Sequence, residues 1–89
     1  MAAMDFRPNL PPRARAVLER VAAAEGVGVS DILGRGRRPA VLRARWRAWS
    51  ELRALRWGGG APSWSRLAGW LQRDRTTIIK GVGRHAGRR

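Results

Sequence analysis

The sequence predicts a small all-α domain, and three observations support this prediction. Apolar residues recur at spacings of three and four in several segments, which is the period of an amphipathic helix. No segment shows the convincing alternation of apolar and polar residues that is typical of a strand. Glycine and proline stand between the periodic segments, where they end one helix or start the next. With 89 residues, the chain is long enough for one modest core.

The first predicted helix covers residues 13–25 and follows a loose N-terminal arm, residues 1–10, in which few positions are periodic. Pro11 and Pro12 suit the start of a helix, because the missing N–H of a proline costs nothing there. Gly26 suits its C-terminal cap. One apolar face is expected in the core: Val17, Leu18, Val21 and Ala24.

A very short helix is predicted next, around Ile32 and Leu33. Ser30 or Asp31 would cap its start, because both side chains can accept from backbone N–H groups. Gly34 would end it.

The longest predicted helix runs from about Pro39 to Arg56 and follows a basic stretch, residues 35–38. Pro39 is well placed as its first residue. Its core-facing stripe would consist of Leu42, Trp46, Trp49, Leu52 and Leu55. Its remaining surface would carry Arg43, Arg47 and Arg53. The glycine-rich segment 57–61 then predicts a flexible loop.

The five tryptophans allow two interpretations. In proteins that bind single strands, aromatic side chains stack on bases. Trp46, Trp49 and Trp70 instead occur at apolar helical positions beside leucine, which favours a place in the core. Trp64 is a candidate for packing under the turn, and Trp57, beside the glycines, is expected to be exposed.

Two further helices are predicted near the C-terminus, the first from Ser63 to Leu71 and the second beginning at Asp74. A tight turn around Gln72 and Arg73 separates them. This order predicts a helix-turn-helix, whose second helix enters the major groove of DNA and contacts base edges mainly through its N-terminal residues. The first turn of that helix would carry Asp74, Arg75, Thr76 and Thr77. The helical domain is predicted to span residues 11–85, followed by a basic tail, residues 86–89. The basic sequence that leads into this tail begins at Gly83.

The residue types at the start of the second helix suit the reading of bases. An arginine can bond guanine through two N–H groups, an aspartate can accept from the amino group of cytosine, and a threonine methyl can pack on the thymine methyl. Asp74 is also a favoured N-cap residue, so capping and base contact are both open roles for it. Of the two threonines, Thr77 is the one expected to be partly buried.

Charge points to a polyanionic partner. Nineteen basic against six acidic residues give a formal net charge of +13, and the sequence pI is about 12.0. A field of this strength favours DNA, RNA or an anionic membrane surface.

Several classes of protein do not fit the sequence. Without cysteine there are no disulfides or thiolate metal sites, and one histidine, His85, makes a zinc site implausible. His85 is expected to be solvated or to face a phosphate. Paired carboxylates, an activated nucleophile and a metal cluster are all missing, so neither catalysis nor a cofactor is expected. No apolar run would span a membrane, and the N-terminus lacks a signal peptide, which predicts a cytoplasmic, nucleoid-associated protein.

The order of these features is similar to that of a known family. Residues 21–33, an Arg-rich loop, a long helix and then Arg73-Asp-Arg-Thr-Thr-Ile-Ile79 resemble the C-terminal DNA-binding domain of the bacterial replication initiator DnaA, over about residues 17–84. That family typically shows Arg-Asp-His-Thr-Thr-Val-Leu-His, and Arg75 stands here in place of the histidine. The loop at residues 58–60 looks longer than the family's, and the turn before Asp74 looks about one residue shorter. No P-loop motif is present, so nucleotide-driven assembly is not expected of this chain alone.

The resemblance implies roles for individual residues. Major-groove bases would be read by Asp74, Arg75, Thr76 and Thr77. Arg37 would enter the adjacent minor groove, with Arg35 or Arg38 as alternatives. Phosphates would be contacted by Arg45, Arg53, Arg84 and Lys80. Arg73, in the turn, completes the predicted DNA-binding set. Trp46 stands where the family has a polar residue near the DNA, so no contact is implied there.

Three functions are compatible with these features. The first is a sequence-specific transcriptional regulator in a phage-like or gene-transfer-agent context, since domains of this type also occur there without the ATPase. The second is an accessory protein at a replication origin or in DNA packaging. The third is a non-specific binder of nucleic acid or anionic membranes, which would need exposed apolar faces that here look committed to the core. The Arg-rich end directly after the recognition helix suggests part of a longer chain that contacts RNA polymerase or another protein.

Overall fold

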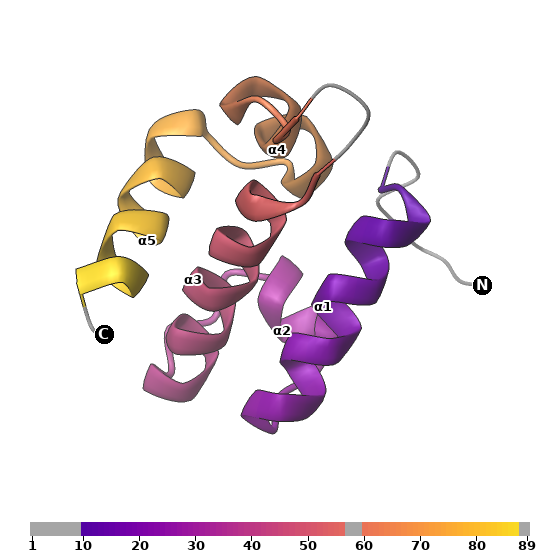
Figure 1. Cartoon of the computed structure of the whole chain (residues 1–89). Helices are drawn as coiled ribbons and strands as arrows, with labels where there is room; N and C mark the ends of the chain where they lie inside the picture. The colour runs from indigo at the N-terminus through magenta and orange to yellow at the C-terminus, as the bar shows by residue number, and fades with distance from the viewer. Residues whose placement is uncertain (1–9, 57–59, 88–89) are drawn as a thin grey trace.

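The computed structural model of the chain describes residues 10–56 and 60–87, which form five helices and no strand. These are α1 (Pro12–Glu25), α2 (Val29–Leu33), α3 (Pro39–Ala54), α4 (Trp64–Leu71) and α5 (Arg75–Gly87). The predicted all-α class is therefore confirmed. Helix α3 is central: α1 and α2 pack on one side of it, α5 packs on the other, and α4 lies beside its C-terminal end (Figure 1).

Helix α1 begins and ends at the residues that its prolines and glycine predict. Pro12 is its first residue, and Gly26 adopts the left-handed conformation with φ 74° and donates its N–H to the carbonyl of Ala22. The buried face consists of Ala14, Val17, Leu18, Val21 and Ala22. Ala24 is exposed, contrary to the prediction, because it stands at the edge of this face in the last turn. Leu10 joins the core, whereas the rest of the predicted arm lies outside the described residues.

Helix α2 starts one residue before the predicted caps. Gly28 occupies the N-cap position and Val29 begins the helix, so the prediction of Ser30 or Asp31 as N-cap is wrong. The Asp31 carboxylate instead accepts from the Gly28 N–H at 2.9 Å, from the third position of the helix. This is the reciprocal half of a capping box, which satisfies a backbone donor that the helix leaves without a partner. Ile32, in the middle of this helix, is buried.

Helix α3 starts at Pro39, as predicted, but ends at Ala54, two residues before Arg56. Its buried face is wider than one apolar stripe, because other helices pack on several sides of it. That face consists of Val41, Ala44, Arg45, Ala48, Trp49 and Leu52. Three members of the predicted stripe are only half-buried: Leu42, Trp46 and Leu55. The predicted exposure of Trp57 falls on a residue outside the described part of the chain.

Helices α4 and α5 are joined by the three residues 72–74. The Ser63 hydroxyl caps α4 by accepting from the Arg66 N–H at 3.1 Å, and Gln72 turns the chain in the left-handed conformation with φ 53°. The Asp74 carbonyl accepts from the Ile78 N–H at 3.2 Å, so Asp74 directly precedes α5. The first residues of the predicted tail, up to Gly87, belong to α5, and residues 88–89 are not described.

Helix α5 approaches α3 closely at a glycine. Gly81 is buried, and a Cβ added to it would overlap the ring of Trp49 and lie 2.8 Å from Cδ1 of Trp46. Trp49 is only 2% exposed and is fixed in the core, so its ring has little room to move. The absence of a side chain at Gly81 therefore sets the distance between these two helices.

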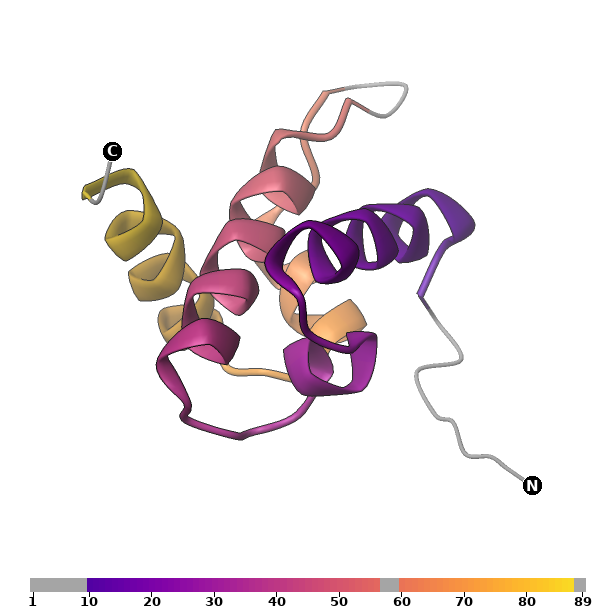
Figure 2. The same cartoon turned by 90° about the horizontal axis from the view of Figure 1, so that it is seen from below.

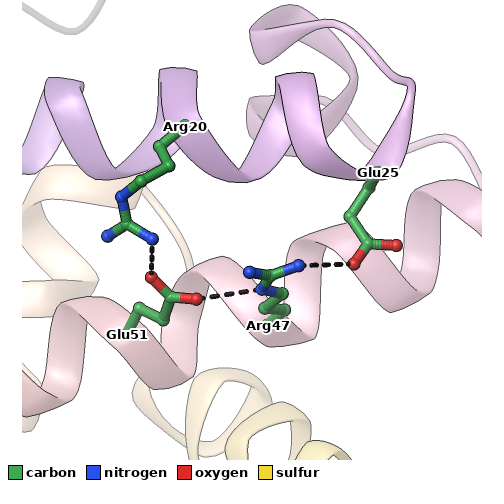
Figure 3. A network of polar contacts seen from close by, with 4 residues as sticks. All are labelled: Arg20, Glu25, Arg47 and Glu51. Atoms are coloured by element: carbon green, nitrogen blue, oxygen red, sulfur yellow. Dashed lines mark hydrogen bonds and ion pairs between the residues drawn. The ribbon is translucent and has the colours of Figure 1, made fainter.

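On the opposite side of α3, a chain of charged groups joins it to α1 (Figure 3). Arg20 of α1 lies 2.6 Å from Glu51 of α3, Arg47 donates to Glu51 at 2.9 Å, and Arg47 also donates to Glu25 of α1 at 2.9 Å. Arg47, predicted on the remaining surface of the helix, is partly exposed there and pairs with two carboxylates. Its pKa is raised by the hydrogen bonds to Glu51 and Glu25, because both stabilise the charged guanidinium.

Candidate nucleic-acid interface

A pocket of about 500 Å³ lies where the segment between α2 and α3 meets α3 and α5. We call residues 35–38 the basic loop and this cavity the basic pocket. Six cations line the pocket: Arg35, Arg37, Arg45, Arg73, Lys80 and Arg84. No carboxylate is among the described residues that line it. The structure thus brings together seven of the predicted DNA-binding residues, these six and Thr77.

Helical spacing explains which residues of α5 face the pocket. Lys80 and Gly81 follow Thr77 by three and four residues, and Arg84 follows Gly81 by three, so these residues share one side of the helix. Arg35 and Arg37 come from the basic loop on the other side of the cavity. Cations from two separate elements therefore border the same space.

Apolar side chains from α3 complete the lining: Leu42, Trp46 and Trp49. The Arg84 guanidinium lies 5.6 Å from the centre of the Trp46 ring, a distance suitable for a cation–π interaction. Trp46 is half-buried, so the predicted core role describes only part of its surroundings. Its indole both supports α5 and holds the Arg84 guanidinium next to the pocket.

Arg45 is placed differently from the prediction of a phosphate contact. It is only 3% exposed, and its guanidinium donates to the carbonyls of Ile32 at 3.1 Å, Gly36 at 2.9 Å and Asp31 at 2.7 Å. Burial lowers its pKa, the charge of Asp31 acts in the opposite direction, and Arg35 lowers the pKa further. Because its donors face backbone carbonyls, the contacts show that Arg45 holds the end of α2 and the basic loop against α3.

Arg73 also makes internal contacts. Its Nη2 donates to the carbonyl of Gly34, and its guanidinium lies 5.7 Å from the centre of the Trp49 ring. The turn before α5 therefore runs past the end of α2, as Figure 2 shows from below. This side chain, which is predicted for DNA contact and lines the basic pocket, thus also links two segments that are far apart in the sequence.

Arg53 does not line the basic pocket. Its guanidinium lies 4.5 Å from the centre of the Trp64 ring, beside α4. The resemblance placed this residue on the DNA backbone, but here it packs on the indole that was expected to support the turn. Arg38 is exposed at the rim of the basic loop, and its guanidinium is 4.0 Å from the Asp31 carboxylate.

The start of α5 forms a separate exposed surface beside the pocket. Asp74, Arg75 and Thr76 are exposed and do not line the cavity, and Arg75 donates to the Ser65 hydroxyl at 3.3 Å. Thr77 is exposed as well, so the expectation that it is partly buried is wrong. His85, farther along α5, is half-buried.

Sequence reasoning missed Ile79, the large apolar side chain on this surface. It is 44% exposed and lies one turn after Arg75 and close to Thr76 on the helix. The sequence did carry a signal for Ile79. It is an apolar residue at the third position after Thr76, and Ile78 and Gly81 already supply the buried face of α5.

Comparisons with known proteins give no relative for this chain: no protein-family model matches it, and no similar curated protein or solved structure was found. None of the described helices has the length and apolar character needed to cross a membrane. The case for a function therefore depends on the pocket and on the surface of α5.

Proposed function

We propose that this chain binds double-stranded DNA, with α5 in the major groove and the basic loop in the adjacent minor groove. The observation that supports it most strongly is the basic pocket, where cations from the loop and from α5 border one space without a carboxylate in its lining. A major groove and the neighbouring minor groove are separated by one sugar–phosphate strand. Cations between two elements that enter these grooves would therefore meet the phosphates of that strand.

In this proposal α4 and α5 act as a helix-turn-helix. The exposed side chains at the start of α5 would read base edges, with Arg75 on guanine and Thr76 or Ile79 against a thymine methyl. Arg75 can exchange its hydrogen bond to Ser65 for a base contact, because the side chain is exposed. Arg37, from the loop, would enter the minor groove, and Lys80 and Arg84 would contact phosphates.

We further propose that the chain is a free-standing DnaA-like module and that it acts as a transcriptional regulator at the bacterial nucleoid. The support is the arrangement of an Arg-rich loop, a long helix and a C-terminal pair of helices around one basic pocket. A regulator would direct RNA polymerase or another protein to its site. Mapping of the bound genomic sites, together with transcript levels after deletion, would distinguish this role from an accessory role in replication or packaging.

Salt titration of duplex binding tests the proposal directly. Each neutralised phosphate adds about −0.9 to the slope of log affinity against log salt concentration, so several arginine contacts predict a slope of at least about −4. A duplex obtained by selection from random sequences should bind more tightly than a scrambled duplex at every salt concentration. A flat salt response would contradict nucleic-acid binding, and equal affinity for both duplexes would reduce the function to non-specific binding.

A further inference from the structure

The last turn of α2 and the segment that follows it are held by two arginines that come from other parts of the chain. Arg45 of α3 donates to three carbonyls, those of Asp31 and Ile32 in α2 and that of Gly36 in the basic loop. Arg73, in the turn before α5, donates to a fourth, that of Gly34. Four carbonyls within six residues thus accept from guanidinium groups.

These bonds satisfy carbonyls that the local backbone leaves without partners. A five-residue helix leaves its last carbonyls without intrahelical partners, and the carbonyls of Asp31 and Ile32 belong to the last turn of α2. The basic loop that follows has no regular secondary structure and contains Gly36, directly after Gly34 and Arg35, so its backbone has few local constraints. One planar guanidinium can serve several carbonyls at once, whereas an ammonium group offers a single point of charge.

We propose that Arg45 and Arg73 are positioning residues that fix the basic loop relative to α5, so that the protein reads a minor-groove flank and a major-groove core at one fixed spacing. This inference rests on the proposed function. Arg73 is two residues before Arg75, so its bond to Gly34 connects the residue directly before the basic loop to the start of the helix that would read bases. Arg45 fixes the same loop to α3 through the carbonyl of Gly36, one residue before Arg37.

A loop fixed relative to α5 requires a fixed distance between its two contact sites on the DNA. If Arg37 enters a narrow, A·T-rich minor groove, that groove must lie at one distance from the bases under α5. Moving the A·T-rich flank by one base pair shifts it by about 3.4 Å along the duplex, beyond the reach of a loop that cannot follow. A loosened loop could follow the flank, at the cost of a weaker preference at the original spacing.

The test measures affinity for a selected duplex and for two versions in which the A·T-rich flank is moved by one base pair in either direction. For the wild type, the shift should weaken binding by about tenfold, the value of one good groove contact. For Arg73→Lys and Arg45→Lys, the difference between original and shifted duplexes should fall to about threefold or less, while the preference for the core sequence stays within about twofold of the wild type. Arg47→Lys, the same change on the α1 side of α3, should retain the wild-type dependence on spacing.

A second measurement examines the loop without DNA. Amide hydrogen exchange at residues 34–38 should be faster in Arg73→Lys and Arg45→Lys than in the wild type, but unchanged in Arg47→Lys. Wild-type exchange and wild-type dependence on spacing in both loop variants would overturn the inference. Indifference of the wild type to flank position would overturn it too, while duplex binding itself would stand. If the wild type bound no duplex, the proposed function would fall, and the exchange rates would still decide whether the two arginines fix the loop.

Discussion

On the side of α3 that faces α1, arginines are paired with glutamates, whereas on the side that faces α5 they surround a pocket with no carboxylate in its lining. Arg47 illustrates the first side, with two carboxylates within 2.9 Å. Arg84 illustrates the second, where the described neighbour of the guanidinium is the indole of Trp46. Figure 1 shows α3 between α1 and α5, and Figure 3 shows the paired arginines on the α1 side.

The comparison shows that the net charge of +13 is not one uniform property of the surface. Paired arginines contribute to the packing of α1 on α3 and leave little charge for a distant partner. Arginines that border the basic pocket reinforce one another's field, which costs stability and favours a polyanion. Substitutions on the two sides should therefore separate stability from binding.

Gly81→Ala should have the largest effect, because it forces α5 away from α3. The added methyl would overlap the ring of Trp49, which is fixed in the core, so the free energy of unfolding should fall by about 1–3 kcal/mol. Gly83→Ala is the matched control on the same helix. An added Cβ there meets no atom within 4 Å, and alanine favours a helix by about 0.5–1 kcal/mol over glycine. Thermal and urea unfolding would measure both, and a loss of stability in the two variants alike would contradict the packing argument.

Lys80→Gln and Arg84→Gln should weaken duplex binding with little change in stability. Each should reduce the salt slope by about 0.9 and the affinity by about five- to tenfold, since each removes one phosphate contact. Arg15→Gln removes the same charge from an exposed position on α1, the far side of α3 (Figure 1). Equal losses in all three variants, measured by fluorescence anisotropy, would mean that total charge and not the basic pocket drives binding.

Much of this arrangement could be predicted from the sequence. Pro12, Pro39, Gly26 and Ser63 mark helix ends by local backbone chemistry, which depends little on the rest of the fold. Helical spacing likewise places Lys80 and Arg84 on one side of α5 before the fold is known.

The role of Arg45 could not be predicted, because its partners are carbonyls whose position depends on how α2 packs. One signal was present: Arg45 follows Val41 by four residues and precedes Ala48 by three, which places it on the buried face of α3. Gly81 shows the same limit. In the sequence it weakens a helix, and only the close approach of Trp49 explains why it is there.

Arg47→Gln should weaken the contacts between α1 and α3 without affecting the basic pocket on the α5 side of α3. It removes the hydrogen bond to Glu25 that joins α3 to α1 and the bond to Glu51 within α3, both at partly exposed positions, so the free energy of unfolding should fall by about 0.5–1 kcal/mol. Duplex affinity and its salt slope should remain at wild-type values, because Arg47 does not line the basic pocket. A lower affinity at unchanged stability would show that the two sides of α3 are not independent.

The smallest expected effect is a dependence of stability on pH through Glu51. Burial by itself raises the pKa of this carboxyl, but hydrogen bonds from Arg47 and Arg20 and their charges outweigh it, so the pKa lies below its ordinary value of 4.5. A carboxyl with a lowered pKa in the folded state stabilises the fold fully above its unfolded pKa, and this contribution is lost as pH falls through the folded value.

Glu51→Gln cannot follow that titration. The difference in unfolding free energy between the wild type and Glu51→Gln should therefore be largest near neutral pH, amount to less than about 1 kcal/mol, and shrink as the pH falls below about 4.5. Glu19→Gln, at an exposed position on α1, controls for the change in net charge. Urea unfolding between pH 7 and about pH 3 would measure the difference. A difference that stays constant across this range would show that the Arg20–Glu51–Arg47 contacts do not stabilise the ionised carboxylate, and that packing alone holds α1 against α3.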